Sequence, residues 1–328
     1  MPKRVVAEII RTGLLEHPAV QAWSQLDPRR VKPEWVQVLK AKKSHVYRLE
    51  GVGPENTAVV AKRCKQETAQ IERTVYENIL PHLTISRLHF YGLVEEPGSE
   101  ASWLFIEDAQ GEAYSRQNQE HLHAAAEWVG QLHVAAEGIL VAASLPQRDA
   151  AYYRRCLLNV RAATHANMSH PALTGDDRGI LNALISRYDV IESHWGDVET
   201  FCNILPHTLV HGDLKGRNVH IRTSGADISV LPFDWELAGW GIPAADVAGF
   251  SCTSAIATYG STVRRAWWHF NVEDIQRIGS IGTIFRCLVV IPGEFKSFPY
   301  DWINKPMMNL RSYSDRLADV LRVLGWSS

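Results

Sequence analysis

The chain has 328 residues, of which 46% are hydrophobic and 21% charged, and its formal net charge is −2. This is the composition of an ordinary globular protein, long enough for two lobes that each have a core. A net charge near zero gives no basic footprint for nucleic acid or for an anionic membrane, so we expect neither as a partner.

Cysteines and apolar runs indicate the compartment. The five cysteines are scattered, odd in number and without a CxxC pair, which favours reduced thiols over a disulfide framework or a zinc site. Glu8 and Arg11 interrupt any signal-peptide core, and no apolar run approaches the roughly 18–20 residues of a membrane span. We therefore expect a cytoplasmic protein. The cysteines are Cys64, Cys156, Cys202, Cys252 and Cys287.

The first third of the chain is predicted to form a small sheet lobe. Apolar spacing predicts a helix over 4–15, and Pro18, Pro28 and Pro33 then mark a loop. A second helix is predicted over 66–80, where Pro81 ends it. Five short β-type runs predict an antiparallel sheet, at 35–39, 45–49, 58–63, 88–95 and 103–107.

The rest of the chain is predicted to be mostly helical, interrupted only by short strands around residue 213. Helical patterns cover 117–137, 150–165 and 177–195, and more follow Ala244. The predicted fold is therefore α+β with two lobes. Residues 1–107 form a sheet lobe with a helical extension over 1–34, and residues 108–328 form a mainly helical lobe.

Two motifs in the second half carry the chemistry. Residues 211–219 read HGDLKGRNV, which places Asp213 and Asn218 on one loop, and residues 231–236 read LPFDWE, which places Asp234 after an apolar run. In phosphoryl transfer one carboxylate accepts the proton of the attacking hydroxyl, while an amide and a second carboxylate hold Mg²⁺ on the phosphates. Any one of these residues could instead cap a helix or a turn, but the spacing of all three favours the functional interpretation.

These motifs resemble the aminoglycoside phosphotransferase and choline kinase family, in which HGDxxxxN is the catalytic loop and a later aspartate belongs to the metal loop. The resemblance implies a bilobal protein-kinase-like fold and a small-molecule kinase. Such an enzyme transfers the γ-phosphoryl group of ATP or GTP to a hydroxyl of a sugar, an antibiotic or an amino alcohol. It also implies that Asp213 is the catalytic base and that Asn218 and Asp234 bind Mg²⁺.

Residues 58–62 (AVVAK) resemble the strand that carries the nucleotide-binding lysine of kinases. There the ammonium of Lys62 would pair with the α- and β-phosphates, and it needs a carboxylate from the following helix. Glu72 matches the family's helix glutamate best, because it precedes an apolar face, but Glu77 stays possible.

The loop 40–44 lies where protein kinases carry a glycine-rich loop, yet it contains no glycine. Its polar side chains are candidates for phosphate contacts, and a solvated charge run is the alternative. They are Lys42, Lys43 and Ser44.

Residues 104–108 (LFIED) resemble the family's hinge. The adenine would hydrogen-bond the backbone at Glu107 to Ala109. Backbone recognition leaves no side-chain signature, so ATP and GTP stay open as co-substrates.

Lys215 makes the loop read HGDLK, closer to serine/threonine kinases than to the HGDxH common among aminoglycoside kinases. A cation here would neutralise charge on the γ-phosphoryl oxygens, and a solvated loop lysine is the alternative. Glu236 would support a second Mg²⁺ or hold the metal loop. His211 is expected to pack beneath the loop, and His133 to be a packing or helix-end residue and not a ligand.

Residues 239–246 (GWGIPAAD) resemble the family's GDPxxDLA segment, in which Asp246 would brace the catalytic loop. The chain departs from that pattern at Ile242, where aspartate is usual.

Two other functions fit parts of the pattern. A protein kinase is disfavoured, because only a short link joins Asp234 to Asp246 and no peptide-docking segment lies between them. A nucleotide-binding pseudokinase is disfavoured, because Lys62, Asp213, Asn218 and Asp234 are all present.

The acceptor pocket is expected from the helices between 140 and 205 and those after Ala244. Residues 247–328 contain nine basic, six acidic and 12 aromatic residues. This composition suits a sugar, a nucleoside-like ring or a single quaternary amine better than a polycation.

Overall fold

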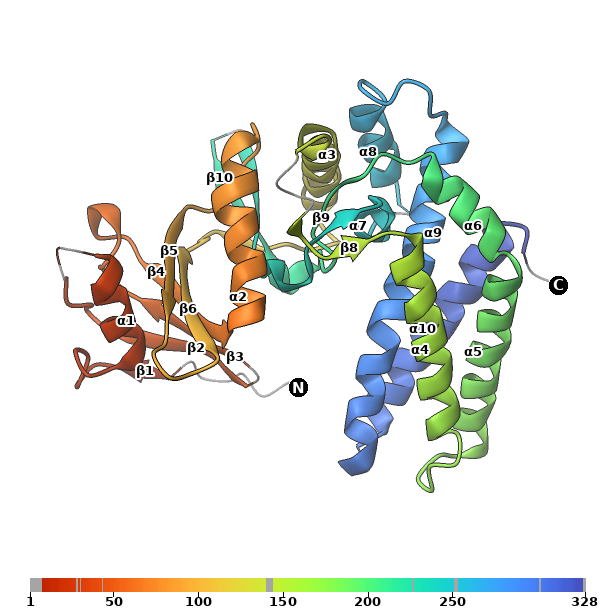
Figure 1. Ribbon diagram of the computed structural model, residues 1–328, viewed down its shortest axis with the longest axis horizontal. Coiled ribbons are helices and arrows are strands. Elements are labelled where there is room, and N and C mark those ends of the chain that lie inside the picture. The colour runs from red at the N-terminus through yellow and green to blue at the C-terminus, as the bar shows by residue number, and fades with distance from the viewer. Residues whose placement is uncertain are drawn as a thin grey trace. The chain divides into compact units, whose positions relative to one another are not determined.

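The computed structural model describes residues 8–27, 29, 31–42, 44–139, 144–225, 227–250, 253–300 and 302–326. It divides into two compact units, coloured along the chain in Figure 1. Unit 1 comprises Met1–Ser115 and Lys215–Ala238, and unit 2 comprises Arg116–Leu214 and Gly239–Ser328. The predicted lobes 1–107 and 108–328 stay a prediction about chain organisation.

Unit 1 is built on a six-stranded antiparallel sheet in the order β1-β2-β3-β4-β6-β5. All five predicted strands are present, and β1 adds one more at the edge. The strands are β1 (Ile9–Ile10), β2 (Val36–Lys42), β3 (Ser44–Leu49), β4 (Val59–Lys65), β5 (Phe90–Glu95) and β6 (Ala101–Glu107).

The helix predicted over 4–15 is wrong for its described part, residues 8–15. Ile9–Ile10 pairs with β2 instead, because β-branched side chains favour a strand, and Gly13 then turns the chain with φ +62°. Helix α1 (Pro18–Leu26) begins where a loop was predicted, with the side chain of His17 as its N-cap. Proline is well suited to the first turn, where its missing N–H has no partner to lose.

Successive side chains of each strand point to opposite faces of the sheet, so the two faces pack against different elements. Trp23 of α1 packs with Ala61 and Phe105, whereas Lys62 and Leu104 belong to the opposite face. That face carries α2 (Gln66–Arg73), which continues as a π-helical segment over Thr74–Ile79. Figure 1 shows α1 and α2 on opposite sides of the sheet, so Lys62 belongs to the side of α2.

A second, three-stranded sheet of unit 1 contains a hairpin. One sequence motif directly precedes its first strand, and the other directly follows its second strand. β10 (Val219–Ser224) pairs with β11 (Asp227–Pro232), and β7 (Glu112–Ala113) adds the third strand. Val219 lies opposite Pro232, so the residues just before β10 and just after β11 meet at one end. There the N–H of Phe233 donates to the carbonyl of Asn218 over 3.0 Å.

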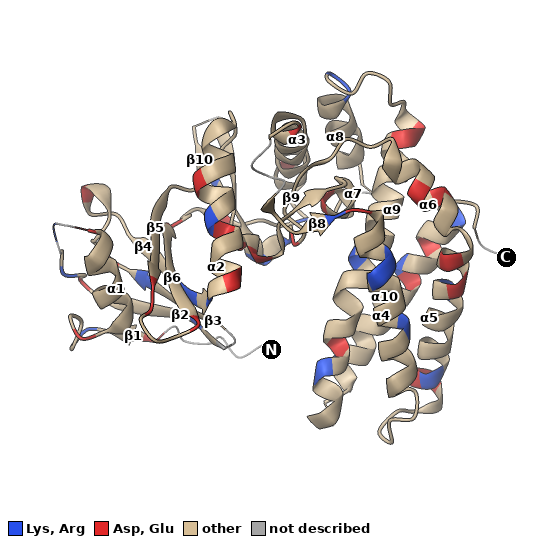
Figure 2. Ribbon diagram, in the orientation of Figure 1, with Lys and Arg blue, Asp and Glu red and all other residues tan. Residues whose placement is uncertain are grey.

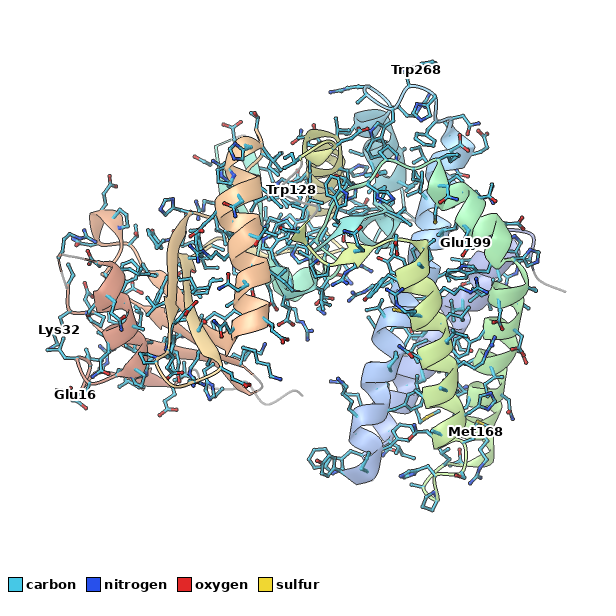
Figure 3. All side chains as sticks on the ribbon, in the orientation of Figure 1. Glu16, Lys32, Trp128, Met168, Glu199 and Trp268 are labelled. Carbon is cyan, nitrogen blue, oxygen red and sulfur yellow. The ribbon has the colours of Figure 1, made fainter. Side chains whose placement is uncertain are left out.

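Unit 2 is mainly helical, and with the sheet of unit 1 it confirms the predicted α+β class. α4, α5, α9 and α10 pack as a bundle whose interior is filled by side chains, and α3 packs on α8 (Figure 3). A small sheet in the order β8-β12-β9 completes the unit. The helices are α3 (Gln119–Ala136), α4 (Ala150–Asn167), α5 (Gly175–Ser193), α6 (Trp195–Asn203), α7 (Ala244–Val247), α8 (Ala255–Val263), α9 (Val272–Glu294) and α10 (Asn304–Val323). The strands are β8 (Gln147–Arg148), β9 (Thr208–Val210) and β12 (Gly239–Gly241).

Helix α9 is more apolar than expected. With the turn after it, Val272–Tyr300 has a window of mean hydropathy 1.4, long and apolar enough to cross a membrane, which differs from the expectation that no run approaches this length. Two-thirds of that window (67%) is buried inside the protein, so its hydropathy reflects packing in the core of unit 2. The four described cysteines are free, and Cys252 lies outside the described residues.

Candidate active site

Unit 1 brings three of the predicted site residues into contact. The Nζ of Lys62 lies 2.5 Å from Glu72 Oε1 and forms a second ion pair with Asp234. Glu236 is more distant, with its Oε2 4.0 Å from the same Nζ. The choice between the two helix glutamates is settled by these contacts, because Glu77 pairs with Arg73 on the exposed face.

The Lys62 ammonium is buried but strongly stabilised. Burial alone would lower the pKa of Lys62, but the carboxylates of Glu72 and Asp234 outweigh burial and raise it well above the ordinary value. Burial also raises the pKa of Glu72, and the contact with Lys62 opposes that rise. Lys62 is therefore held as a cation beside a locally negative cluster.

Asp234 occupies an unusual backbone conformation directly after β11. Its φ of +67° and ψ of 57° are left-handed, a region in which aspartate is more often found than most non-glycine residues. The short 3₁₀ helix Trp235–Leu237 follows and packs against α2. Backbone strain of this kind is often kept where a side chain must point in one direction.

The residues around Asp234 fit a magnesium site by the chemistry of their donors. Asn218 and Asp234 lie at one end of the hairpin, and their amide and carboxylate oxygens are hard ligands that suit Mg²⁺. Among the described residues no group of three or more His, Cys, Asp or Glu side chains forms a metal site. One or two protein ligands are nevertheless usual for Mg²⁺, because phosphates and water complete its shell.

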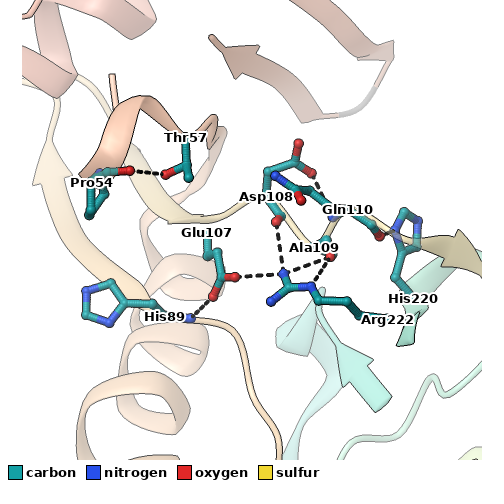
Figure 4. A network of polar contacts seen from close by, with 9 residues as sticks. All are labelled: Pro54, Thr57, His89, Glu107, Asp108, Ala109, Gln110, His220 and Arg222. Carbon is teal, nitrogen blue, oxygen red and sulfur yellow. Dashed lines mark hydrogen bonds and ion pairs between the residues drawn. The ribbon is translucent and has the colours of Figure 1, made fainter. Parts of the chain in front are cut away.

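The hinge residues are organised by Arg222 of β10 (Figure 4). Its Nη2 donates to Glu107 Oε1 over 2.7 Å and to the carbonyl of Ala109 over 2.9 Å. Glu107 Oε2 also accepts from the N–H of His89 over 3.0 Å. Ala109 is 6% exposed, and its own N–H has no hydrogen-bond partner within the described part of the chain.

Ser44 and Lys42 flank Lys43 at the junction of β2 and β3. Ser44 is buried at the start of β3, and no hydrogen bond among the described residues links it to Lys62 or Asp234. Lys42 is the last residue of β2, and Lys43 lies outside the described residues. Their predicted contacts with phosphate stay predictions.

Asp213 belongs to unit 2, on the loop that follows β9. Asp246, which is fully buried at the start of α7, accepts from the N–H of His211 over 2.7 Å and from the N–H of Gly212 over 2.8 Å. The predicted bracing by Asp246 is therefore confirmed. His211 is buried beneath the loop, where its Nδ1 accepts from the N–H of Asp213 over 3.3 Å, and His133 packs with Asp246, as expected.

Arg286 of α9 is a second anchor of the same loop. Its Nη1 donates to the carbonyl of Gly212 over 2.7 Å, and its Nη2 forms an ion pair with the carboxylate of Asp213. The Asp213 side chain is 9% exposed. The guanidinium therefore lies directly on the proposed base.

Lys215 begins the next segment of chain, which belongs to unit 1. It precedes the short 3₁₀ helix Gly216–Asn218, and its carbonyl accepts from the N–H of Asn218 over 2.8 Å. The Lys215 side chain is half-buried, whereas Arg217 is exposed. Asn218 is buried at 3% exposure.

Neither Arg222 nor Arg286 was among the site residues predicted from the sequence. Arg286 stands inside a run of buried apolar residues of α9, and a single cation in such a run is a signal that it has a buried partner. Arg222 has no such signal, because it alternates with apolar residues on an ordinary strand.

Comparison with known proteins places these observations in context. A phosphotransferase enzyme family model matches residues 36–278. No curated protein matches the chain significantly by sequence. The wild-type aminoglycoside 2′-phosphotransferase-IIIa, solved as a GDP complex, is similar in structure, with 12% identity, a TM-score of 0.65, and coverage of 90% of this chain and 97% of its own.

Two further solved structures share the fold. Choline kinase from Cryptosporidium parvum has 11% identity and a TM-score of 0.64, and the match covers 94% of this chain and 96% of that one. Spectinomycin phosphotransferase, solved with ADP and spectinomycin, has 10% identity and a TM-score of 0.58, with 90% and 95% covered. These matches confirm the kinase-like fold, and the family match covers most of the chain. The protein is a phosphotransferase that belongs to the phosphotransferase enzyme family.

Proposed function

We propose that the protein transfers the γ-phosphoryl group of ATP or GTP to a hydroxyl of a small molecule such as a sugar, an antibiotic or an amino alcohol. The observation that carries the proposal is the ion-pair cluster of Lys62, Glu72 and Asp234. It combines a charged lysine, the glutamate that holds it, and an aspartate beside an amide that suits Mg²⁺. A module that only bound nucleotide could share this cluster, but it would not need Asp213 as a general base as well.

In this proposal Lys62 binds the α- and β-phosphates, and Glu72 keeps its ammonium in place. Asn218 and Asp234 would hold Mg²⁺, with Glu236 in support, and the bound ion would neutralise charge on the phosphates. Asp213 would accept the proton of the acceptor hydroxyl as its oxygen attacks the γ-phosphorus. The leaving nucleoside diphosphate departs from the opposite side of that phosphorus.

The N–H of Ala109, which has no hydrogen-bond partner among the described residues, supports a place for the purine base. A ring nitrogen of adenine, or the O6 of guanine, would accept from this N–H, so both nucleotides fit. The structures solved with GDP and with ADP show that this fold accommodates both nucleotides.

The acceptor would bind to unit 2, because Asp213 lies there. Figure 2 shows both acidic and basic residues on the helices of that unit. Residues 247–328 contain nine basic and six acidic residues, a balance that does not favour a polycationic antibiotic. We therefore rank sugars and single amines above polyamines as test acceptors.

The proposal is tested by incubating the protein with Mg·ATP or Mg·GTP and a panel of sugars, amino alcohols and antibiotics. Mass spectrometry should detect an acceptor heavier by one phosphoryl group, with one nucleoside diphosphate released for each. A thermal-shift screen with nucleotide present narrows the panel first, since a bound acceptor stabilises the folded state. Nucleotide binding with no product across a broad panel would argue for a pseudokinase.

Lys215 provides a sharper prediction about the transition state. If its ammonium neutralises charge that grows on the γ-phosphoryl group, Lys215→Ala should lower kcat and kcat/KM together by about 10²–10³. The nucleotide KM should change little. Steady-state kinetics of the purified variant decide the matter, and Arg217→Ala, on the exposed neighbour, is the control. A kcat within about threefold of wild type would make Lys215 a solvated loop residue.

Arg222 should affect nucleotide binding without affecting the chemical step. Hydrogen bonds to a charged group are typically worth about 1.5–3 kcal/mol, so Arg222→Gln should raise the nucleotide KM by roughly tenfold or more because the hinge loses its support. The kcat should stay within about twofold. Arg63→Gln removes a comparable half-exposed arginine–glutamate pair on β4 and serves as the control. Equal effects of the two substitutions on KM would contradict a specific role of Arg222.

A further inference from the structure

The loop that carries Asp213 is held at one residue, Gly212, by side chains from two different helices. The N–H of Gly212 donates to Asp246, and its carbonyl accepts from Arg286 over 2.7 Å. Gly212 has φ +75°, a left-handed conformation that glycine adopts without steric cost. Its two polar groups are thus fixed by side chains from two different helices, α7 and α9.

Those two helices are themselves locked together. A Cβ built on Gly282 of α9 would lie 1.8 Å from the carbonyl oxygen of Ala244 at the start of α7. Only glycine permits this approach of the two backbones, so α7 and α9 cannot slide past one another without losing it. The distance between the anchors Asp246 and Arg286 is therefore set by backbone packing.

The part of α9 that carries Arg286 is fixed by packing. Its helix neighbours Phe285 and Cys287 are buried, and the ring of Phe285 stacks on Tyr153 of α4 with centroids 3.8 Å apart. A capping box at Asn271 and Asp274 fixes the start of α9. The guanidinium therefore reaches the loop from a rigid helix.

We propose that Arg286 is a positioning residue for phosphoryl transfer, a role that rests on the function proposed above. The guanidinium of Arg286 donates to the backbone carbonyl of Gly212 and forms an ion pair with the carboxylate of Asp213. This planar, two-point contact fixes the rotation of the Asp213 side chain as well as the path of its backbone. The carboxylate is thereby held in one orientation toward the acceptor hydroxyl.

Positioning of this kind has a distinctive kinetic signature. In phosphoryl transfer the protein contributes mainly orientation and charge, and a misplacement of about 1 Å costs on the order of 10²-fold in rate. Arg286 belongs to unit 2, whereas the Lys62 cluster and the contacts of Arg222 with Glu107 and Ala109 belong to unit 1. Its loss should therefore lower kcat and leave the nucleotide affinity unchanged.

The test compares Arg286→Gln with Arg277→Gln, which removes a second half-buried arginine from the same helix, stacked on Phe201 and away from the loop. We expect kcat to fall by roughly 10²-fold in Arg286→Gln and to stay within about twofold in Arg277→Gln. The Kd of Mg·ATP should be unchanged in both variants. Arg286→Lys should recover only part of the rate, because a point charge cannot make the two-point contact.

Two further measurements separate positioning from folding. Added guanidinium should partly restore kcat in Arg286→Ala and have no such effect on Arg277→Ala. In the Asp213→Asn background, Arg286→Gln should cause less than about threefold further loss of kcat, because the residue acts through Asp213. An active wild-type protein whose kcat is unaffected by Arg286→Gln, or a full additional loss in the Asp213→Asn background, would overturn the inference alone. A wild-type protein that transfers phosphate to no acceptor would overturn the proposed function, and the role of Arg286 with it.

Discussion

Replacing Asp213 with asparagine is expected to lower kcat by about 10²–10⁴, the usual contribution of a positioned general base. The amide removes the negative charge that accepts the hydroxyl proton. Its oxygen can still accept from Arg286, so the loop 211–213 should keep its place. The Kd of Mg·ATP should stay within about threefold, because Asp213 is proposed to act on the acceptor and belongs to unit 2, whereas the Lys62 cluster belongs to unit 1.

Steady-state kinetics and nucleotide titration on the same preparation measure both halves of this expectation. Asp197→Asn is the control, because Asp197 is an exposed carboxylate of the same unit, at the start of α6. A kcat within a few-fold of wild type in Asp213→Asn, with the chemical step rate-limiting, would assign the base elsewhere. A large loss of nucleotide affinity would show that the loop and the nucleotide site are not separable.

The sheet of unit 1 could be predicted because its signals are local. Each of the five predicted strands is a short run of alternating or β-branched residues between turn residues, and each forms close to its predicted bounds. The N-terminal residues misled the same reasoning. Ile9 and Ile10 fit a helical period and a strand equally well, and pairing with β2 decided between them.

Some residues of the candidate site could be predicted from local sequence signals, and others could not. Asp213, Asn218 and Asp234 could be named as candidates from their spacing along the chain, and Lys62 from the resemblance of its strand to that of kinases. The partner of Lys62 could only be narrowed to two glutamates. The helical register after β4 and the burial of Glu72 then separated it from Glu77.

The contacts of Arg222 and Arg286 could not be predicted from local sequence patterns. Arg222 lies 113 residues from Ala109 along the chain, and Arg286 lies 73 residues from Asp213. Contacts of such separation depend on how whole elements pack, and a single arginine carries no periodicity that could reveal its partner. The apolar run around Arg286 pointed to a buried charge, but not to the group that neutralises it.

Replacing Asp234 with asparagine is expected to abolish the Mg²⁺ dependence of nucleotide binding and, with it, turnover. Asparagine tolerates the left-handed conformation of this position, so the substitution removes charge without adding backbone strain. Mutating a residue that only hydrogen-bonds to a metal ligand lowers metal affinity by about 10–100-fold, so loss of a direct ligand should lower it at least as much.

Isothermal titration of ATP with and without Mg²⁺ measures this, and Asp227→Asn, at an exposed position of the same hairpin, is the control. Loss of the carboxylate also removes one of the two ion pairs of Lys62, so metal-free nucleotide should bind Asp234→Asn no more weakly than wild type. If the gain in affinity on adding Mg²⁺ were the same in Asp234→Asn as in wild type, the metal ligand would have to be sought at Glu236, whose carboxylate lies 4.0 Å from the Lys62 ammonium.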